Sequence, residues 1–252
     1  MKKTRVRADE LLVLRGLAPT RAKAKACLMA GQVFVEGRAQ TKAGILIDED
    51  AAIEVRSPCP YVSRGGLKLA AALKGLGVSP RGRVCLDVGA STGGFTDCLL
   101  QEGAARVYAV DVGHGQLHAK IAADSRVVSI EKTHARSLDP ALFAPAPDFA
   151  TADVSFISLT LVLPAIASCL KSPWVLLALV KPQFEVGPKL APKGVVRDPA
   201  ARAAALAKIR EAAAALGLRE TGVFESPVHG PKGNIETFIR LASPIAQSWE
   251  IY

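Results

Sequence analysis

The stretch LDVGASTGGFTDCLL, residues 86–100, decides the fold, because it has the pattern of a strand, a glycine-rich turn and a helix in succession. Gly89, Gly93 and Gly94 let the backbone turn tightly and let a ligand approach it closely. In α/β sheets, ligands usually bind in the crevice at the carboxyl ends of the strands. The stretch therefore predicts one strand–turn–helix unit of an α/β domain, with a nucleotide-like ligand bound at the turn.

Outward from this unit, strand-like and helix-like stretches alternate along the chain. Helices are expected over residues 94–102, 157–170 and 199–216. Repeated strand–helix units predict an α/β fold with a doubly wound, mostly parallel, seven-stranded Rossmann-like sheet. A loop without a helix joins the last two strands, so these two are expected to be antiparallel. The expected strands are residues 83–88, 106–112, 126–131, 148–154, 174–180, 217–226 and 235–241.

The N-terminal part of the chain has a different pattern. Residues 1–25 contain eight basic residues against two acidic ones. Two short helices are expected, over residues 9–15 and from a cap at Thr20 to about residue 30, and short strands follow them. The prolines of SPCPY, residues 57–61, are typical of an extended linker.

Two domains are therefore expected. Residues 1–60 form a small, basic α+β domain, and residues 61–252 form the larger α/β domain that contains the glycine-rich turn.

The overall composition is that of a globular protein with a positive charge. Half of the residues are hydrophobic, 22% are charged, and the formal net charge is +9. This charge favours a polyanionic partner such as nucleic acid, or an anionic membrane surface. The five cysteines form no C-x-x-C pair and the four histidines show no metal-ligand spacing, so we expect reduced thiols, a cytoplasmic location and no metal site. The longest apolar stretch, residues 156–170, is too short to span a bilayer.

The acids around the turn indicate its ligand. In a dinucleotide fingerprint a glycine would replace Ser91, and here an acid, Asp87, precedes the first glycine by two residues. A negative charge there suits a cationic ligand, and Asp111, at the end of the next strand, can accept hydrogen bonds from both ribose hydroxyls. These features favour S-adenosylmethionine, a sulfonium cation that carries an adenosine. NAD and a purely structural turn are the alternatives. The residues expected to contact the cofactor are Asp87, Gly89, Ala90, Ser91, Thr92, Gly93, Gly94, Phe95, Asp111 and Asp153.

One further acid of this stretch has two interpretations. Asp97 lies one helical turn beyond the glycines, where it is either a solvated or capping acid or a ligand contact.

Two charged residues end neighbouring strands at the same edge of the expected sheet. In PWVLLALVKPQFE, residues 173–185, an unbroken apolar run ends at Lys181, and Asp153 ends the preceding strand. The carboxyl ends of parallel strands would bring both side chains beside the cofactor. The alternatives are that Asp153 caps the following helix and that Lys181 only reaches to water.

Two more charged residues join this pair through a resemblance. Lys68 in SRGGLKL and Glu236 in NIETF, with Asp153 in ADVSFISL and Lys181 in LVKPQFE, resemble the Lys-Asp-Lys-Glu tetrad of FtsJ (RrmJ)-type RNA ribose 2′-O-methyltransferases. These motifs and LDVGASTGGFTD follow the order and spacing of the TlyA family of ribosomal-RNA 2′-O-methyltransferases, also labelled haemolysin A. Residues 7–37 resemble the alpha-L RNA-binding module, whereas the linker SPCPY departs from the family pattern.

The resemblance implies an enzyme that methylates ribose 2′-hydroxyls of ribosomal RNA, free or in ribosomal subunits, with S-adenosylmethionine as the methyl donor. Lys181 would act as the base and Lys68 would steer the hydroxyl, while Asp153 and Glu236 hold the lysines; which lysine releases its proton is left open. A cytolytic, membrane-active protein and a non-catalytic RNA-binding assembly factor are the alternatives.

The chain also offers candidates for RNA contact. Only 5% of the residues are aromatic, which favours structured RNA that is recognised by its shape. The residues expected to contact RNA phosphates are Arg5, Arg7, Arg21, Lys23, Lys25 and Arg64.

Overall fold

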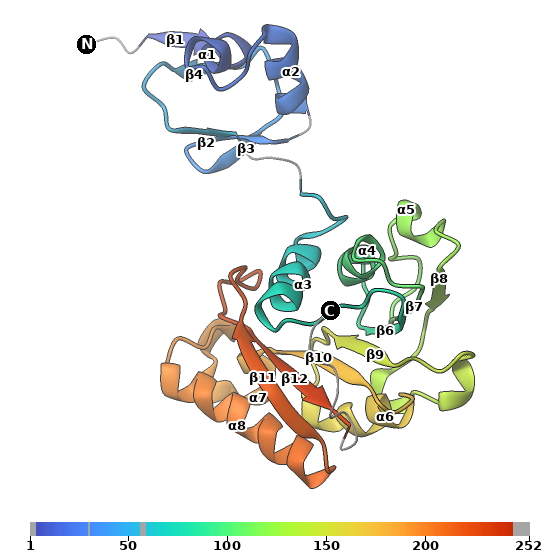
Figure 1. The fold of residues 1–252 in the computed structure, drawn as a ribbon. Coiled ribbons are helices and arrows are strands. Elements are labelled where there is room, and N and C mark those ends of the chain that lie inside the picture. The colour runs from blue at the N-terminus through green and yellow to red at the C-terminus, as the bar shows by residue number, and fades with distance from the viewer. Residues whose placement is uncertain (1–3, 30, 56–58, 244–252) are drawn as a thin grey trace. The chain divides into compact units, whose positions relative to one another are not determined.

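The structure, a computed structural model, describes residues 4–29, 31–55 and 59–243. The chain separates into two compact units, Met1–Cys59 and Pro60–Tyr252 (Figure 1). Residues 57 and 58, which begin the expected linker, lie outside the described residues.

The N-terminal unit combines two helices with two small antiparallel sheets. Thr20 accepts a hydrogen bond from the Lys23 amide (3.2 Å) at the start of the second helix, as expected for a helix cap. One sheet pairs β1 with β4, and the other has the order β3-β2-β5. Leu11, Leu12 and Leu28 are fully or almost fully buried in the core of this unit. The elements are β1 (Arg5–Arg7), α1 (Ala8–Leu14), α2 (Arg21–Met29), β2 (Val33–Val35), β3 (Arg38–Gln40), β4 (Leu46–Asp48) and β5 (Ile53–Val55).

The second unit is built on a seven-stranded sheet with the order β11-β12-β10-β9-β6-β7-β8. The strands from β10 to β8 in this order are parallel, whereas β12 is antiparallel to both of its neighbours. The predicted α/β fold, with a mostly parallel sheet and an antiparallel last pair, is therefore confirmed. The strands are β6 (Val84–Val88), β7 (Arg106–Val110), β8 (Val127–Ile130), β9 (Phe149–Ala152), β10 (Val175–Val180), β11 (Arg219–Glu225) and β12 (Thr237–Ala242).

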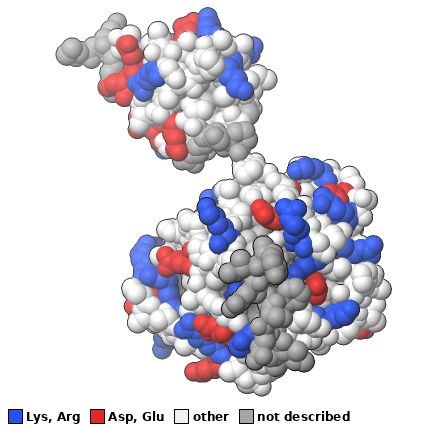
Figure 2. Space-filling model, viewed as in Figure 1, with Lys and Arg blue, Asp and Glu red and all other residues white. Residues whose placement is uncertain are grey.

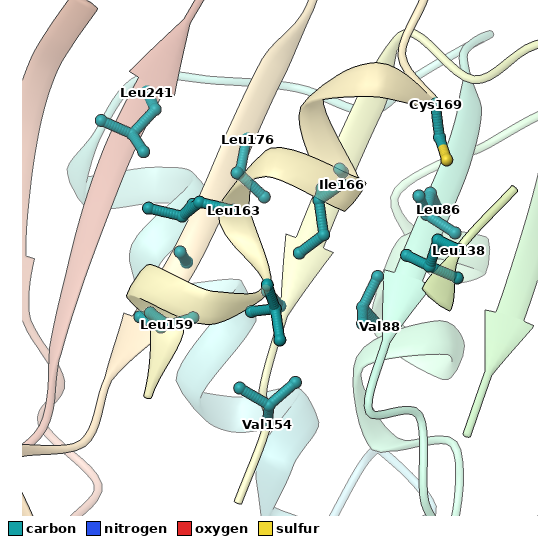
Figure 3. Packing of buried hydrophobic residues seen from close by; sticks show 14 of the residues in the cluster. Leu86, Val88, Leu138, Val154, Leu159, Leu163, Ile166, Cys169, Leu176 and Leu241 are labelled. Carbon is teal, nitrogen blue, oxygen red and sulfur yellow. The ribbon is translucent and has the colours of Figure 1, made fainter. Parts of the chain in front are cut away.

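Helices cover both faces of this sheet. On one face, α3 (Arg64–Gly75), α4 (Gly94–Gln101) and α5 (Ala119–Ala122) pack on an apolar cluster that contains Phe149 and Phe238. On the other face, α6 (Leu163–Ser168) and α8 (Pro199–Ala215) complete a second cluster. Figure 3 shows Leu163 and Ile166 of α6 over the strands that carry Leu86 and Leu176. All six residues of β10 are buried, because helices cover this central strand on both sides.

The expected helix over residues 157–170 is wrong. The chain instead forms a 3-10 turn, η3 (Leu159–Leu161), and then the short helix α6. Pro164 occupies the first turn of α6, where its missing N–H costs nothing, and it would break a helix that continued through it. The helix α3 was not expected, although Ser63 caps it by accepting a hydrogen bond from the Gly65 amide.

Five short elements complete the second unit. Two turns, η1 (Ala135–Ser137) and η2 (Pro140–Leu142), connect β8 to β9. The helix α7 (Pro182–Glu185) follows β10 directly, and η4 (Pro188–Leu190) and η5 (Pro192–Gly194) lead to α8. Among the helices of the described residues, none is both long and apolar enough to cross a bilayer.

Candidate active site

A pocket of about 880 Å³ opens at the carboxyl ends of β6, β7 and β9. Gly89 and Ser91 of the glycine-rich turn, Asp111 after β7 and Asp153 after β9 all line it. Its position agrees with the ligand crevice expected for this fold, and its volume is sufficient for a cofactor-sized ligand.

The backbone of the glycine-rich turn lies directly against the end of β9. Gly89 has a φ of +85°, and a Cβ atom there would lie 2.6 Å from the carbonyl oxygen of Asp153. Only glycine fits this position without displacing the backbone. A Cβ on Gly94 would collide with the hydroxyl of Ser63, so the start of α4 also packs closely on the start of α3.

Asp111 has the geometry expected of an acid that binds a ribose. Its Oδ2 accepts a hydrogen bond from the Ser91 amide (2.8 Å), and its Oδ1 accepts one from the Gly113 amide (2.7 Å). These bonds fix the carboxylate at the pocket wall, where each oxygen keeps a lone pair for a ligand hydroxyl. The site therefore fits the adenosine part of S-adenosylmethionine.

Asp87 is not at the pocket wall, contrary to the expected ligand contact. It is completely buried, and its two oxygens accept hydrogen bonds from the hydroxyls of Thr96 (2.7 Å) and Thr151 (3.0 Å). Burial raises the pKa of Asp87 to about 7, although the two hydroxyls oppose this shift. Asp87 thus links β6, directly before the turn, to α4 through Thr96 and to β9 through Thr151.

Other residues expected to contact the cofactor also lie off this pocket wall. Phe95 belongs to the core, where its ring stacks on Phe238 with 5.9 Å between the ring centroids. The other residues that do not line the pocket are Ala90, Thr92, Gly93 and Gly94. Their part in the site is to shape the turn that presents Gly89 and Ser91.

Asp97 is buried in a structural role. Its Oδ2 accepts a hydrogen bond from the Val62 amide (2.9 Å), and its Oδ1 accepts bonds from Gln101 (3.0 Å) and Lys120 (3.3 Å). Gln101 also donates to the carbonyl of Pro60 (3.0 Å). Asp97 and Gln101 therefore anchor the first residues of the second unit on α4.

The four charged residues predicted as a tetrad form two lysine–carboxylate pairs. Lys181 Nζ lies 2.7 Å from Asp153 Oδ1 and donates a hydrogen bond to Ser155 (2.8 Å). Lys68 Nζ donates to Glu236 Oε2 (2.5 Å). The side chains of Lys68 and Lys181 are only 10% and 12% exposed, so Lys181 does not simply reach into water.

The sheet register explains why these pairs lie at one edge. Val180 pairs with Thr237, so Lys181 after β10 and Glu236 before β12 occupy adjacent positions on neighbouring strands. Asp153 follows β9, the other neighbour of β10. Strand pairing therefore brings together residues that are far apart in the sequence.

Glu185 is a further buried acid, for which the sequence suggested no role. Its Oε1 accepts a hydrogen bond from the Leu159 amide (2.8 Å), and its Oε2 accepts bonds from Ser158 (2.5 Å) and Lys208 (3.2 Å). Glu185 belongs to α7, directly after Lys181, and it binds the segment that follows Asp153. It therefore holds together the two segments that carry the Lys181–Asp153 pair.

Phe156 also lines the pocket and was not predicted. Its side chain is 92% exposed, and its backbone has the left-handed φ of +63°, which is uncommon for a bulky residue. Its ring contacts Phe184 of α7, with 5.1 Å between the centroids. An exposed aromatic ring thus stands at the mouth of the pocket.

The N-terminal residues expected to contact RNA fall into two groups. Arg7 and Arg21 both form ion pairs with the buried Asp9, at 3.0 and 3.1 Å, and Arg5 pairs with Asp48 at 3.1 Å. Hydrogen bonds from Arg7 and Arg21 lower the pKa of Asp9 to about 2, although burial opposes them. The remaining candidates, Lys23 and Lys25 on α2 and Arg64 on α3, are exposed.

Comparisons with known proteins agree with this geometry. Residues 61–243 match the FtsJ-like methyltransferase family. The chain is 48% identical to the putative rRNA methyltransferase YqxC of Bacillus subtilis, over 97% of this chain and 88% of the relative. It is 45% identical to the 16S/23S rRNA (cytidine-2′-O)-methyltransferase TlyA of Mycobacterium tuberculosis, over 94% of this chain and 90% of the relative.

A solved structure is similar over both units. It is that of a putative hemolysin from Streptococcus thermophilus, with 41% sequence identity and a TM-score of 0.75. The match covers 96% of this chain and 90% of the other. Within the described residues, no group of three or more His, Cys, Asp or Glu side chains is placed to hold a metal ion.

Proposed function

The chain belongs to the FtsJ-like methyltransferase family, and we propose that it methylates ribose 2′-hydroxyls of ribosomal RNA with S-adenosylmethionine as the methyl donor. The observation that carries the proposal is the presence of two lysine–carboxylate pairs beside a nucleotide-sized pocket. The names of the two curated relatives support the class of RNA.

The pocket residues bind and orient the donor. When bound, S-adenosylmethionine supplies a methyl group that its sulfonium has already activated for transfer. Asp111 accepts hydrogen bonds from the ribose hydroxyls of the adenosine, and the backbone at Gly89 and Ser91 approaches the ligand closely.

The lysine pairs prepare the acceptor. A ribose hydroxyl is a poor nucleophile at neutral pH, so it has to be aligned and has to lose a proton. Of the four residues only Asp153 lines the pocket, so Lys181, the lysine that Asp153 holds, is assigned as the proton acceptor in its uncharged form. Asp153 and Ser155 fix the position of the Lys181 amine, and the buried Lys68–Glu236 pair places a second cation near the hydroxyl.

The remaining features fit an RNA substrate. The exposed ring of Phe156 offers a surface on which a base can stack beside the pocket. The basic N-terminal unit, as an alpha-L type module over residues 1–60, contacts structured RNA, and residues 61–252 act on it. A cytoplasmic location and a partner that is ribosomal RNA, free or in a subunit, follow from this assignment.

Two other functions have less support. A membrane-active protein would have no need of lysine–carboxylate pairs beside a nucleotide-sized pocket, although a structurally similar protein carries the name hemolysin. A non-catalytic assembly factor would have no need of a lysine held by Asp153 at the pocket.

The test uses purified protein, 16S and 23S ribosomal RNA, and S-adenosylmethionine with a labelled methyl group. The wild type should transfer label to RNA, and reverse-transcription stops should locate it on ribose. Lys181→Met should lower the rate by about 10² to 10⁴, the usual contribution of a general base, without changing affinity for S-adenosylmethionine. The control Lys171→Met changes an exposed lysine before β10, at the opposite edge of the sheet, and should have no effect. Label on bases, or a fully active Lys181→Met, would contradict the proposal.

A further inference from the structure

Two loops beside the lysine–carboxylate pairs carry cations to which the proposed reaction gives no role. Residues 187–197 connect α7 to α8, and residues 226–236 connect β11 to β12; together they are called the basic loop pair. Their cationic side chains are all exposed: Lys189, Lys193 and Arg197 on the first loop and Lys232 on the second.

A buried asparagine holds the two loops together. Asn234 is 2% exposed; its Nδ2 donates to the carbonyl of Gly194 (2.9 Å), and its Oδ1 accepts from the amide of Val196 (2.9 Å). Lys232 Nζ adds a contact of 3.4 Å to the carbonyl of Lys193. These contacts hold the backbone of residues 193–196, in the first loop, against the second loop.

The loop pair adjoins the catalytic residues on two sides. The first loop follows α7, which begins directly after Lys181, and the second loop ends at Glu236. A Cβ on Gly230 would lie 2.6 Å from Glu236 Oε1, so the second loop passes directly over the Lys68–Glu236 pair. In Figure 1 the connection between β11 and β12, drawn in red, lies near the start of α8.

The charge of the loop pair is not neutralised. The whole connection between α7 and α8, residues 186–198, contains one acid, Asp198, whose Oδ1 accepts a hydrogen bond from the Ala200 amide (2.9 Å). The only acid in residues 226–236 is Glu236, which is buried against Lys68. In the part of the chain that the structure describes, none of the four cations is paired with a carboxylate. Figure 2 shows Lys and Arg side chains interspersed with Asp and Glu on the drawn face of this unit.

We propose that the basic loop pair is a phosphate clamp, in which Lys189, Lys193, Arg197 and Lys232 contact the RNA phosphates that flank the target ribose. The inference rests on the proposed function. A ribose whose 2′-hydroxyl reaches Lys181 carries a phosphate on each side, so the RNA backbone has to pass the edge at which these loops stand. Exposed cations that outnumber the acids beside them are suited to that backbone, because each phosphate contact releases condensed counterions.

The clamp predicts the salt dependence of RNA binding by the full-length protein. For Lys193→Ala combined with Lys232→Ala, the slope of log K against log salt should fall by about 1.4 to 1.8, since each phosphate contact contributes about 0.7 to 0.9. Affinity for 23S RNA at 0.1 M salt should fall roughly 25- to 60-fold, and the KM for RNA should rise accordingly. Affinity for S-adenosylmethionine should not change, and the melting temperature should stay close to that of the wild type, because Asn234 still holds the two loops together.

A matched control removes the same charge elsewhere. Lys74→Ala combined with Lys171→Ala changes two exposed lysines, one in the last turn of α3 and one before β10, and should leave the slope unaltered. Lys189→Ala combined with Arg197→Ala repeats the test at independent positions. An unchanged slope in both loop variants would overturn the clamp, even if the wild type methylates ribosomal RNA. A wild type that transfers no methyl group to RNA would instead overturn the proposed function. Loss of binding to anionic vesicles, with the RNA slope unchanged, would assign the loops to a membrane and also overturn the clamp.

Discussion

The two units of the chain differ in whether the cation of a buried ion pair is itself withdrawn from water. In the N-terminal unit the buried group is a carboxylate, Asp9, and its partners Arg7 and Arg21 keep 44% and 55% of their side chains exposed. At the sheet edge of the second unit the lysines themselves are withdrawn from water, with Lys68 and Lys181 only 10% and 12% exposed. An arginine stays protonated in proteins, whereas a lysine can release its proton when it is buried. The first cluster therefore keeps its cations in water, whereas the second buries the two lysines that the proposed reaction uses.

The largest effect is expected for Lys68→Met. This change leaves Glu236 buried without a cation, so the free energy of unfolding should fall by about 3 to 5 kcal/mol and methylation should be lost. Adding Glu236→Met restores an uncharged, packed pair and should recover most of the stability but none of the activity. Denaturant unfolding and methyl transfer, measured on the same preparations, separate the two roles. If the double variant regained activity, the role of Lys68 would be structural, and the proposed difference between the two units would be wrong.

Asp9→Ala should disrupt the ion-pair cluster of the N-terminal unit, in which Arg7 and Arg21 both bind Asp9. The change removes the shared partner of two arginines that water can still solvate, so we expect a loss of about 1 to 3 kcal/mol, confined to the N-terminal unit. Hydrogen exchange of the α1 amides would measure it. Glu10→Ala, which removes a half-exposed partner of Arg21, should cost less than about 0.5 kcal/mol. A comparable loss in both variants would show that burial of Asp9 has no special effect.

Glu185→Gln tests a third lysine–carboxylate pair of the second unit, because Glu185 is a buried acid that pairs with Lys208 away from the pocket. Glutamine keeps the acceptor for Leu159 but removes the charge that binds Lys208, so the segments that carry Lys181 and Asp153 should loosen. We expect roughly a tenfold lower kcat with an unchanged KM for RNA, because misplacement of a catalytic group lowers the rate of the chemical step. Glu211→Gln, an exposed acid on α8, is the control. An equal decrease in both variants would refute a positioning role.

The smallest effect is a difference in pH dependence between two buried aspartates. The pKa of Asp9 is lowered from 3.8 to about 2 in the folded chain, so its contribution to stability is complete above about pH 4 and is lost as the pH falls towards 2. The pKa of Asp87 is raised from 3.8 to about 7, so between these values the folded chain holds a proton that the unfolded chain has released. Its contribution therefore declines as the pH rises from about 4 to 7.

Asp87→Asn isolates the second contribution. The amide presents no titrating group to Thr96 and Thr151, so the melting temperature of the variant relative to the wild type should rise with pH up to about 7 and then stay level. Melting curves from pH 4 to 8 would test this. Parallel curves for variant and wild type would mean that Asp87 is not the source of the pH dependence.

Features that follow from the order of strands and helices were predictable from the sequence. The unbroken apolar run before Lys181 indicated a strand buried on both faces, and all six residues of β10 are buried. The order of strands and helices likewise indicated the parallel sheet. It follows that a lysine at the tip of that strand lies at the ligand edge.

The direction in which an individual side chain points was harder to predict from the sequence. Leu86 and Val88 pack on one face of the sheet, so alternation along β6 turns Asp87 to the other face, towards Thr96 of α4. That alternation was the available signal, but an acid next to a glycine turn suggested a ligand contact instead. Glu185 gave no such signal, because its partners Ser158 and Lys208 are distant in the sequence and meet it only when the chain is folded.

The contacts of the first residues of the second unit determine where a cleavage can separate the two units. Pro60 and Val62 are bonded to α4 through Gln101 and Asp97, Ser63 caps α3, and α3 carries Lys68 to its pair with Glu236. A shortened enzyme that begins after Ser63 would lose the cap and the anchor of the helix that carries Lys68. The methyltransferase unit can therefore be separated only by a cleavage that leaves Pro60 on its own side.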